Sequence, residues 1–105
     1  MKISVLGSGS WGCALAQILV RNGHDVVVWG IDETEVNDIN QNHQNSRYFK
    51  DVKLDERLKA TTDMSLIAGS EALLLAVPSM AIDSVMENAE KYLAKSCICV
   101  TIEVE

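Results

Sequence analysis

The feature that most constrains this sequence is a glycine-rich segment close to its start, Gly7–Gly12, which reads G-S-G-S-W-G. A short, mostly apolar run (residues 1–6) precedes it, and apolar side chains recur at helical spacing over residues 11–22 after it. Three glycines alone would be a weak indicator, because glycine is a common residue. A strand, a glycine turn and a helix in this order, however, form the context in which the pattern G-x-G-x-x-G binds a dinucleotide.

Each glycine of this segment has its own expected role. Gly7 permits a tight turn after the strand, Gly9 leaves room for a pyrophosphate, and Gly12 lets the helix pack closely on the strand. The free N–H groups at the helix start would face the phosphates, at the positive end of the helix dipole. The alternative is a glycine-rich turn that binds no ligand. If the turn does bind phosphates, the residues expected at the site are Gly7, Ser8, Gly9, Ser10, Trp11 and Gly12.

Composition limits the other ligands that this chain of 105 residues is expected to bind. Hydrophobic residues make up 48% and charged residues 23%, which is typical of one globular domain. The formal net charge of -6 disfavours general binding to nucleic acids or to anionic membranes. A phosphate ligand would therefore be held by local backbone N–H groups and not by a basic surface.

The cysteines and the N-terminus indicate a compartment. Cys13, Cys97 and Cys99 are odd in number and lack C-x-x-C spacing, which argues against a disulfide framework and against a zinc site. Cys97 and Cys99 are expected to pack on one face of a strand. The first strand leaves no room for a signal peptide, and no apolar run approaches the roughly 20 residues of a membrane helix. We expect no metal site and a reducing, cytoplasmic location.

The remaining apolar runs predict the fold. Strands are expected at residues 1–6, 26–29, 58–62, 72–77 and 97–102, and helices at 11–22, 33–42, 63–68 and from Ser79 to about 93, with Ser79 as a cap. Five strands alternating with four helices predict a Rossmann-like, doubly wound parallel sheet of one domain, with strand order 3-2-1-4-5. Residues 7–12 and 77–79 should then face each other across one crevice.

The segment after the second strand carries two open interpretations. Asp32 follows Gly12 by 20 residues, as expected of an acid that binds the ribose of the cofactor. Asp32 also begins D-E-T-E, a capping box with Glu35 in third place, so it could serve as a helix cap instead. The polar stretch 41–56 is too long for a tight connection and predicts a surface excursion. Its residues Arg47, Tyr48 and Phe49 could reach a cofactor or pack down the loop.

Several stretches together resemble one family. They are K-I-S-V-L-G-S-G-S-W-G (2–12), R-N-G-H-D-V-V-V-W-G (21–30), L-K-A-T-T-D (58–63) and L-L-A-V-P-S (74–79). They are similar to the N-terminal domain of bacterial NAD(P)-dependent glycerol-3-phosphate dehydrogenase, over nearly the whole chain. The resemblance implies a cofactor domain, a nicotinamide dinucleotide (NAD or NADP) as partner, and interconversion of dihydroxyacetone phosphate and sn-glycerol 3-phosphate. It implies cofactor contacts at Ser10 and Trp11, and it places Tyr48 or Phe49 near the cofactor. It also places Val77, Pro78 and Ser79 beside the nicotinamide.

The sequence departs from that family at two places. Ile31 stands where an arginine or histidine is common, and isoleucine cannot neutralise a 2′-phosphate, so we expect NADH to bind at least as well as NADPH. Residues 100–105 read V-T-I-E-V-E in place of a T-K-G-I-E-like segment, so the family's lysine is missing near Val104. The substrate domain is also missing from residues 1–105, and we expect no catalytic residue here, with His43 as the only residual candidate.

Three functions from different classes are therefore compatible with the sequence. The first is the cofactor domain of an oxidoreductase. The second is a stand-alone nucleotide-binding module that does no chemistry. The third is a fragment stabilised by self-association, as a homodimer in which a partner copy covers the exposed face.

Overall fold

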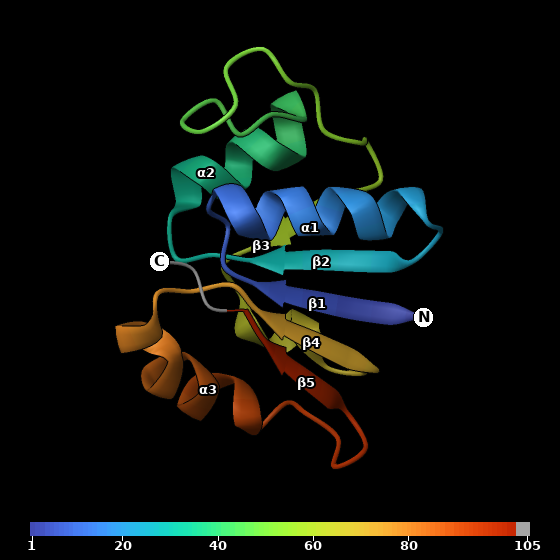
Figure 1. Cartoon of the computed structure of the whole chain (residues 1–105), viewed down its shortest axis with the longest axis vertical. Coiled ribbons are helices and arrows are strands. Elements are labelled where there is room, and N and C mark those ends of the chain that lie inside the picture. The colour runs from blue at the N-terminus through green and yellow to red at the C-terminus, as the bar shows by residue number, and fades with distance from the viewer. Residues whose placement is uncertain (103–105) are drawn as a thin grey trace.

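The computed structural model describes residues 1–102, which form one five-stranded parallel sheet in the order β3-β2-β1-β4-β5 (Figure 1). The strands are β1 (Lys2–Leu6), β2 (Asp25–Trp29), β3 (Lys59–Thr61), β4 (Ala72–Leu75) and β5 (Ile98–Thr101). The predicted doubly wound sheet and its strand order are confirmed. β1 lies at the centre, paired with β2 on one side and with β4 on the other.

Two apolar layers cover the two faces of the sheet, because neighbouring strand residues point to opposite sides. On one face Val5 packs with α1 (Ser10–Arg21), with α2 (Glu33–Asn37) and with the π-helical turn Asp38–Asn42 that continues α2. On the other face Leu6 packs with the 3₁₀ turn Met64–Ile67 and with α3 (Ile82–Glu90). A further 3₁₀ turn, Ser79–Ala81, leads into α3.

Three local expectations need correction. The second helix ends at Asn37 and widens into the π-helical turn instead of running to Asn42 as a regular α-helix. Ser79 does not cap α3: it belongs to the 3₁₀ turn, and the N-cap, Ala81, makes no side-chain bond. Cys99 is exposed and does not pack as expected. β5 is the edge strand beside β4, and its four residues are all exposed.

The described residues place two further limits on the chain. No helix within residues 1–102 is long and apolar enough to span a lipid bilayer. Across the same residues, histidine, cysteine, aspartate and glutamate side chains do not gather in threes around a point where a metal ion could sit.

Candidate functional site

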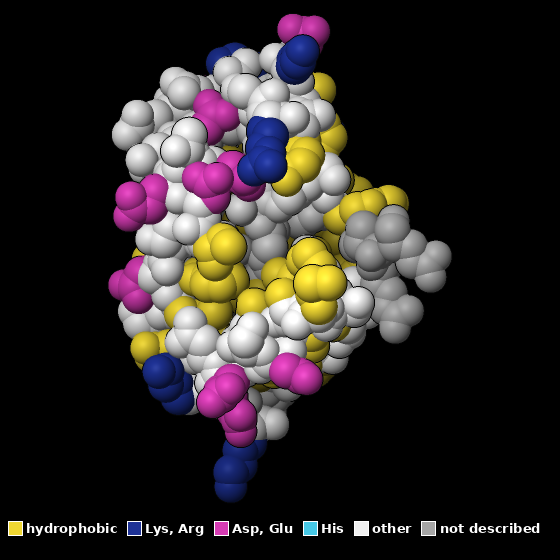
Figure 2. Space-filling model, turned by 90° about the vertical axis from the view of Figure 1, so that its left-hand side faces the viewer, with side chains coloured by type: hydrophobic (Ala, Val, Ile, Leu, Met, Phe, Trp, Pro, Cys, Tyr) yellow, Lys and Arg dark blue, Asp and Glu magenta, His cyan; other side chains and the backbone are white. Residues whose placement is uncertain are grey.

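A pocket of about 450 Å³ lies at the carboxyl edge of the sheet, between the ends of the neighbouring strands β1 and β4. The chain leaves these two strands toward opposite faces of the sheet. Ligands of open α/β sheets bind at this kind of switch point. Figure 2 looks onto this edge and shows hydrophobic side chains gathered around a hollow. The pocket is lined by Gly7, Ser8, Gly9, Ser10, Trp11, Trp29, Gly30, Ile31, Glu35, Tyr48, Ala76, Val77, Pro78, Ala81 and Val85.

The first turn of the pocket wall depends on two glycines. Gly7 has φ of +125°, and a Cβ there would overlap the carbonyl oxygen of Ala76 on the neighbouring strand end. A Cβ on Gly12 would overlap the carbonyl oxygen of Gly7. The close approach predicted for Gly12 is therefore present, and the atoms that a side chain would meet belong chiefly to the turn itself.

Gly9 differs from these two glycines, because it faces open space. The nearest atom to a Cβ built on Gly9 is the hydroxyl oxygen of Tyr48, at 3.9 Å. Gly9 is also the N-cap of α1, and Cys13 N–H donates the first helical hydrogen bond to its carbonyl at 3.0 Å. The N–H groups of Ser10, Trp11 and Gly12 precede that bond, as at every helix start. Within the part of the chain that the structure describes, the turn thus presents unpartnered donors beside free space.

Gly30, at the end of β2, lets the turn approach the second strand. A Cβ on Gly30 would lie 2.6 Å from the Cβ of Ser8, inside contact distance. The amide of Gly7 donates to the carbonyl of Trp29 at 2.7 Å. The sequence did not single out Gly30 as a site residue, since its role depends on a contact across 22 residues of chain.

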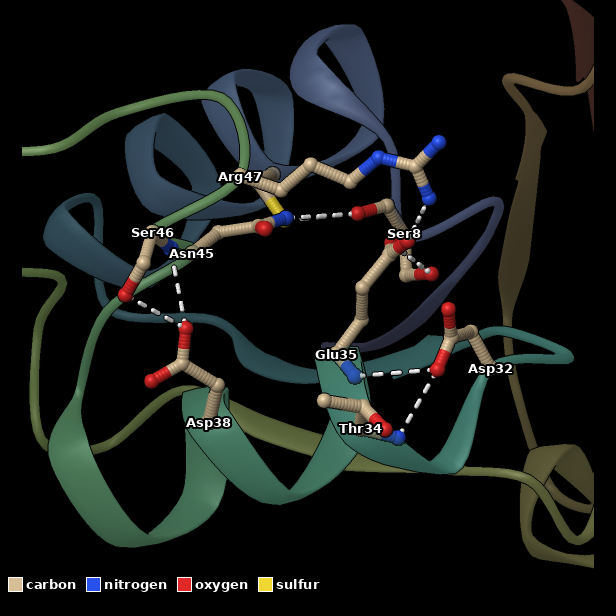
Figure 3. A network of polar contacts seen from close by, with 9 residues as sticks. Ser8, Asp32, Thr34, Glu35, Asp38, Asn45, Ser46 and Arg47 are labelled. Atoms are coloured by element: carbon tan, nitrogen blue, oxygen red, sulfur yellow. Dashed lines mark hydrogen bonds and ion pairs between the residues drawn. The ribbon is translucent and has the colours of Figure 1, made fainter.

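Asp32 serves as the N-cap of α2. Its Oδ1 accepts from the backbone N–H of Thr34 at 2.8 Å and of Glu35 at 3.4 Å (Figure 3). The cap interpretation of Asp32 is therefore present in the structure. The ribose contact stays a prediction, and Asp32 does not belong to the pocket lining.

Glu35 is the acid that lines the pocket, and its side chain is only 10% exposed. Its Oε1 accepts from the hydroxyl of Ser8 at 3.0 Å, and its Oε2 pairs with Nη1 of Arg47 at 3.3 Å (Figure 3). The capping box predicted Glu35 only as a partner of its own helix. In the structure its carboxylate instead joins α2 to the glycine turn and to the polar excursion.

The excursion after α2 is anchored to the same turn. Asn45 is fully buried, and its amide donates to the carbonyl of Ser8 at 2.7 Å and to Cys13 Sγ at 3.2 Å. The carboxylate of Asp38 accepts from Ser46 N–H at 2.8 Å, and this bond holds the pKa of Asp38 below its usual range. Held in this way, the excursion brings Tyr48 to the pocket.

Cys13 is fully buried on α1, and this desolvation raises the pKa of its thiol, while the hydrogen bond from Asn45 opposes the rise. A raised pKa leaves less of the reactive thiolate at neutral pH. We expect iodoacetamide to modify the exposed Cys99 in the native chain and to reach Cys13 only after denaturation. Peptide mass spectrometry on native and urea-treated samples measures both. Rapid native labelling of Cys13 would show that α1 opens away from the excursion.

The pocket brings together most of the residues expected from the sequence. The glycine turn through Trp11 lines it, together with Ile31, Tyr48, Val77 and Pro78, while Gly12, Asp32 and Ser79 lie outside the lining. Sequence reasoning missed Trp29, Gly30, Glu35, Ala76, Ala81 and Val85. Gly30 and Ala76 directly flank the predicted residues Ile31 and Val77, and this adjacency along the chain was the signal available for them. Val104, where the family's lysine was expected, lies outside the described residues.

Known proteins resemble this chain over most of its length. A glycerol-3-phosphate dehydrogenase [NAD(P)+] of Streptococcus uberis is 51% identical over 79 residues, which are 74% of this chain and 23% of that protein. The corresponding protein of Bacillus licheniformis is 40% identical over 102 residues, covering 96% of this chain and 30% of that one. The crystal structure of glycerol-3-phosphate dehydrogenase from Coxiella burnetii is 31% identical and superposes with a TM-score of 0.87, over 95% of this chain and 31% of that one.

This chain thus spans less than a third of the length of these relatives. The family model described as "NAD-dependent glycerol-3-phosphate dehydrogenase N-terminus" matches residues 2–103. That match covers nearly every residue, including the glycine turn and the strand ends that form the pocket. The chain therefore belongs to the family of NAD-dependent glycerol-3-phosphate dehydrogenase N-terminal domains.

Proposed function

We propose that residues 1–105 are the dinucleotide-binding domain of a glycerol-3-phosphate dehydrogenase and that they hold NAD or NADP in the pocket at the carboxyl edge of the sheet. The observation that carries the proposal is the wall formed by Gly9 and the start of α1. There, N–H groups without helical partners lie beside space that no side chain of residues 1–102 fills. Backbone donors at a helix N-terminus suit a pyrophosphate on a chain with net charge -6.

The rest of the pocket suits the remaining parts of a dinucleotide. Its volume of about 450 Å³ lies within the range of about 300–1,000 Å³ typical of cofactor sites. Val77 and Pro78 would lie beside the nicotinamide, with Ala81 and Val85 extending the same apolar wall. Ile31, which is 83% exposed, and Tyr48 would lie on the side of the pocket away from the nicotinamide. Ser10 and Trp11 would contact the phosphates, and Gly7, Ser8 and Gly12 would shape their turn.

The first test is direct binding. Trp11 and Trp29 both line the pocket, so their fluorescence should be quenched when a dihydronicotinamide binds. Side-by-side titrations with NADH and NADPH give both dissociation constants from the same signal. Saturable quenching that NAD competes away supports the proposal, and the absence of any saturable quenching would overturn it.

We propose that the reaction of the whole protein interconverts dihydroxyacetone phosphate and sn-glycerol 3-phosphate, with the bound cofactor supplying or accepting the hydride. Reduction of the ketone also needs a proton donor and a positive group near the carbonyl oxygen. Among the residues that the structure describes, the pocket lining offers Tyr48 and Glu35 as titratable groups and no lysine or histidine. Those two tasks therefore belong to residues beyond this pocket.

The chain by itself is accordingly expected to bind NADH without turnover. The assay follows the nicotinamide absorbance while purified chain is incubated with NADH and dihydroxyacetone phosphate, with a full-length glycerol-3-phosphate dehydrogenase as the positive control. The expected rate equals that of a no-protein blank. Turnover that survives removal of host enzyme would instead indicate His43, which does not line the pocket, or catalysis across two copies.

Location and self-association are also proposals. Free thiols at Cys13, Cys97 and Cys99 are compatible with the reducing cytoplasm. The exposed apolar side chains Ile98 and Val100 on edge strand β5 are compatible with pairing to a second copy. Analytical ultracentrifugation of the chain and of an Ile98→Lys variant tests the pairing.

A further inference from the structure

We infer that Glu35, and not Asp32, is the acid that sets the choice between NAD and NADP, with Arg47 as its counter-ion. This inference rests on the proposed function, because it assigns a specificity role within the same pocket. In dinucleotide-binding folds an acid near the end of the second strand binds the ribose 2′-hydroxyl, and that acid disfavours a 2′-phosphate. Two acids of this chain, Asp32 and Glu35, compete for that role.

The competition is decided by where each carboxylate is held. One oxygen of Asp32 is committed to the backbone N–H groups that begin α2, and the residue lies outside the pocket lining. Glu35 lines the pocket, and its carboxylate bonds the hydroxyl of Ser8 within the glycine turn (Figure 3). Glu35 is therefore joined to the same turn that would hold the phosphates.

The contacts of Glu35 leave it able to accept another hydrogen bond. An ionised carboxylate has about four acceptor positions, and Glu35 has one partner on each oxygen, Ser8 and Arg47. A ribose hydroxyl can therefore donate to it. A 2′-phosphate offers no suitable donor and adds negative charge beside a carboxylate that is already 90% buried, where repulsion is poorly screened.

Arg47 gives this arrangement its second half. The Arg47 side chain is 67% exposed and does not line the pocket. Its Nη1 nevertheless lies 3.3 Å from Oε2 of Glu35, which does line the pocket. While Arg47 and Glu35 are paired, the carboxylate cancels part of the electric field of the guanidinium. If the charge of Glu35 is removed, the same cation becomes available to a 2′-phosphate.

The experiment compares three variants by tryptophan quenching with NADH and NADPH. Glu35→Gln keeps the size of the side chain and removes its charge. It should shift the ratio of the two dissociation constants toward NADPH by about tenfold or more. Arg47→Gln should shift the ratio the opposite way, because Glu35 then lacks its counter-ion. The matched control is Asp32→Asn, the same acid-to-amide change three residues away, and asparagine is also a good N-cap. It should move the ratio less than about twofold.

The outcomes separate this inference from the proposed function. Failure of the unmodified chain to bind either cofactor would overturn both. Normal NADH binding with an unchanged ratio in Glu35→Gln and Arg47→Gln would overturn the role of Glu35 alone. A shift in Asp32→Asn that exceeds the shift in Glu35→Gln would assign the ribose contact to Asp32. If Glu35→Gln fails to fold by circular dichroism, the exposed Arg47→Gln variant still decides, because an unmoved ratio there contradicts the pairing.

Discussion

Replacing Gly9 by valine should weaken NADH binding by about a hundredfold or more, which corresponds to about 2.7 kcal/mol of binding free energy, and leave the fold intact. The reason is the space beside Gly9, where the nearest atom to an added Cβ is the Tyr48 hydroxyl at 3.9 Å. A valine side chain meets little protein there, but it fills the volume beside the first N–H groups of α1. The pyrophosphate would lose both its space and its donors.

Two controls show whether the loss is local. Ser84→Val places the same side chain on an exposed position of α3 outside the pocket lining, and should bind NADH normally. Gly9→Ala, with a smaller side chain, should give an intermediate affinity. The helical signal in circular dichroism should match the unmodified chain in all three variants. Unchanged affinity in Gly9→Val would mean that this turn does not hold the phosphates.

Replacing Gly12 by alanine should destabilise the domain, although alanine favours helices over glycine by about 1 kcal/mol. A Cβ at this position would overlap the carbonyl oxygen of Gly7 and lie 2.9 Å from its carbonyl carbon. These are backbone atoms of a turn that is itself tied to β2, so no flexible side chain can move aside. Overpacking of this kind typically costs about 1–3 kcal/mol and occasionally more. The helix preference offsets about 1 kcal/mol of this cost, so we expect a net loss of up to about 2 kcal/mol.

Urea denaturation followed by circular dichroism measures this loss, and the same substitution elsewhere provides the controls. Gly9→Ala should be tolerated, because its backbone is extended and its surroundings are open. Gly23→Ala has free space but a φ of +89°, so it should cost about 1 kcal/mol from backbone strain alone. A Gly12→Ala variant as stable as Gly9→Ala would show that α1 can slide away from the turn at little cost.

The sequence by itself determined the elements of this domain that depend on neighbours in the chain. The glycine turn was predictable, because Gly7–Gly12 lies between an apolar run and a helical repeat. The strand order followed from five apolar runs separated by helices, since the handedness of crossover connections leaves few arrangements. The N-cap role of Asp32 was predictable for the same reason, because its partners are the next residues along the chain.

Only the tertiary structure decided which polar groups meet at the pocket. Glu35 bonds Ser8 across 27 residues, and Asn45 bonds the same turn across 37. No periodicity encodes such contacts, because they depend on the exact path of the excursion between α2 and β3. The exposure of β5 could likewise not be predicted from its apolar run, because the sequence pattern of an apolar strand does not show whether another layer covers it. Local chemistry thus determined the turn and the strands, while long-range packing decided which acid faces the pocket.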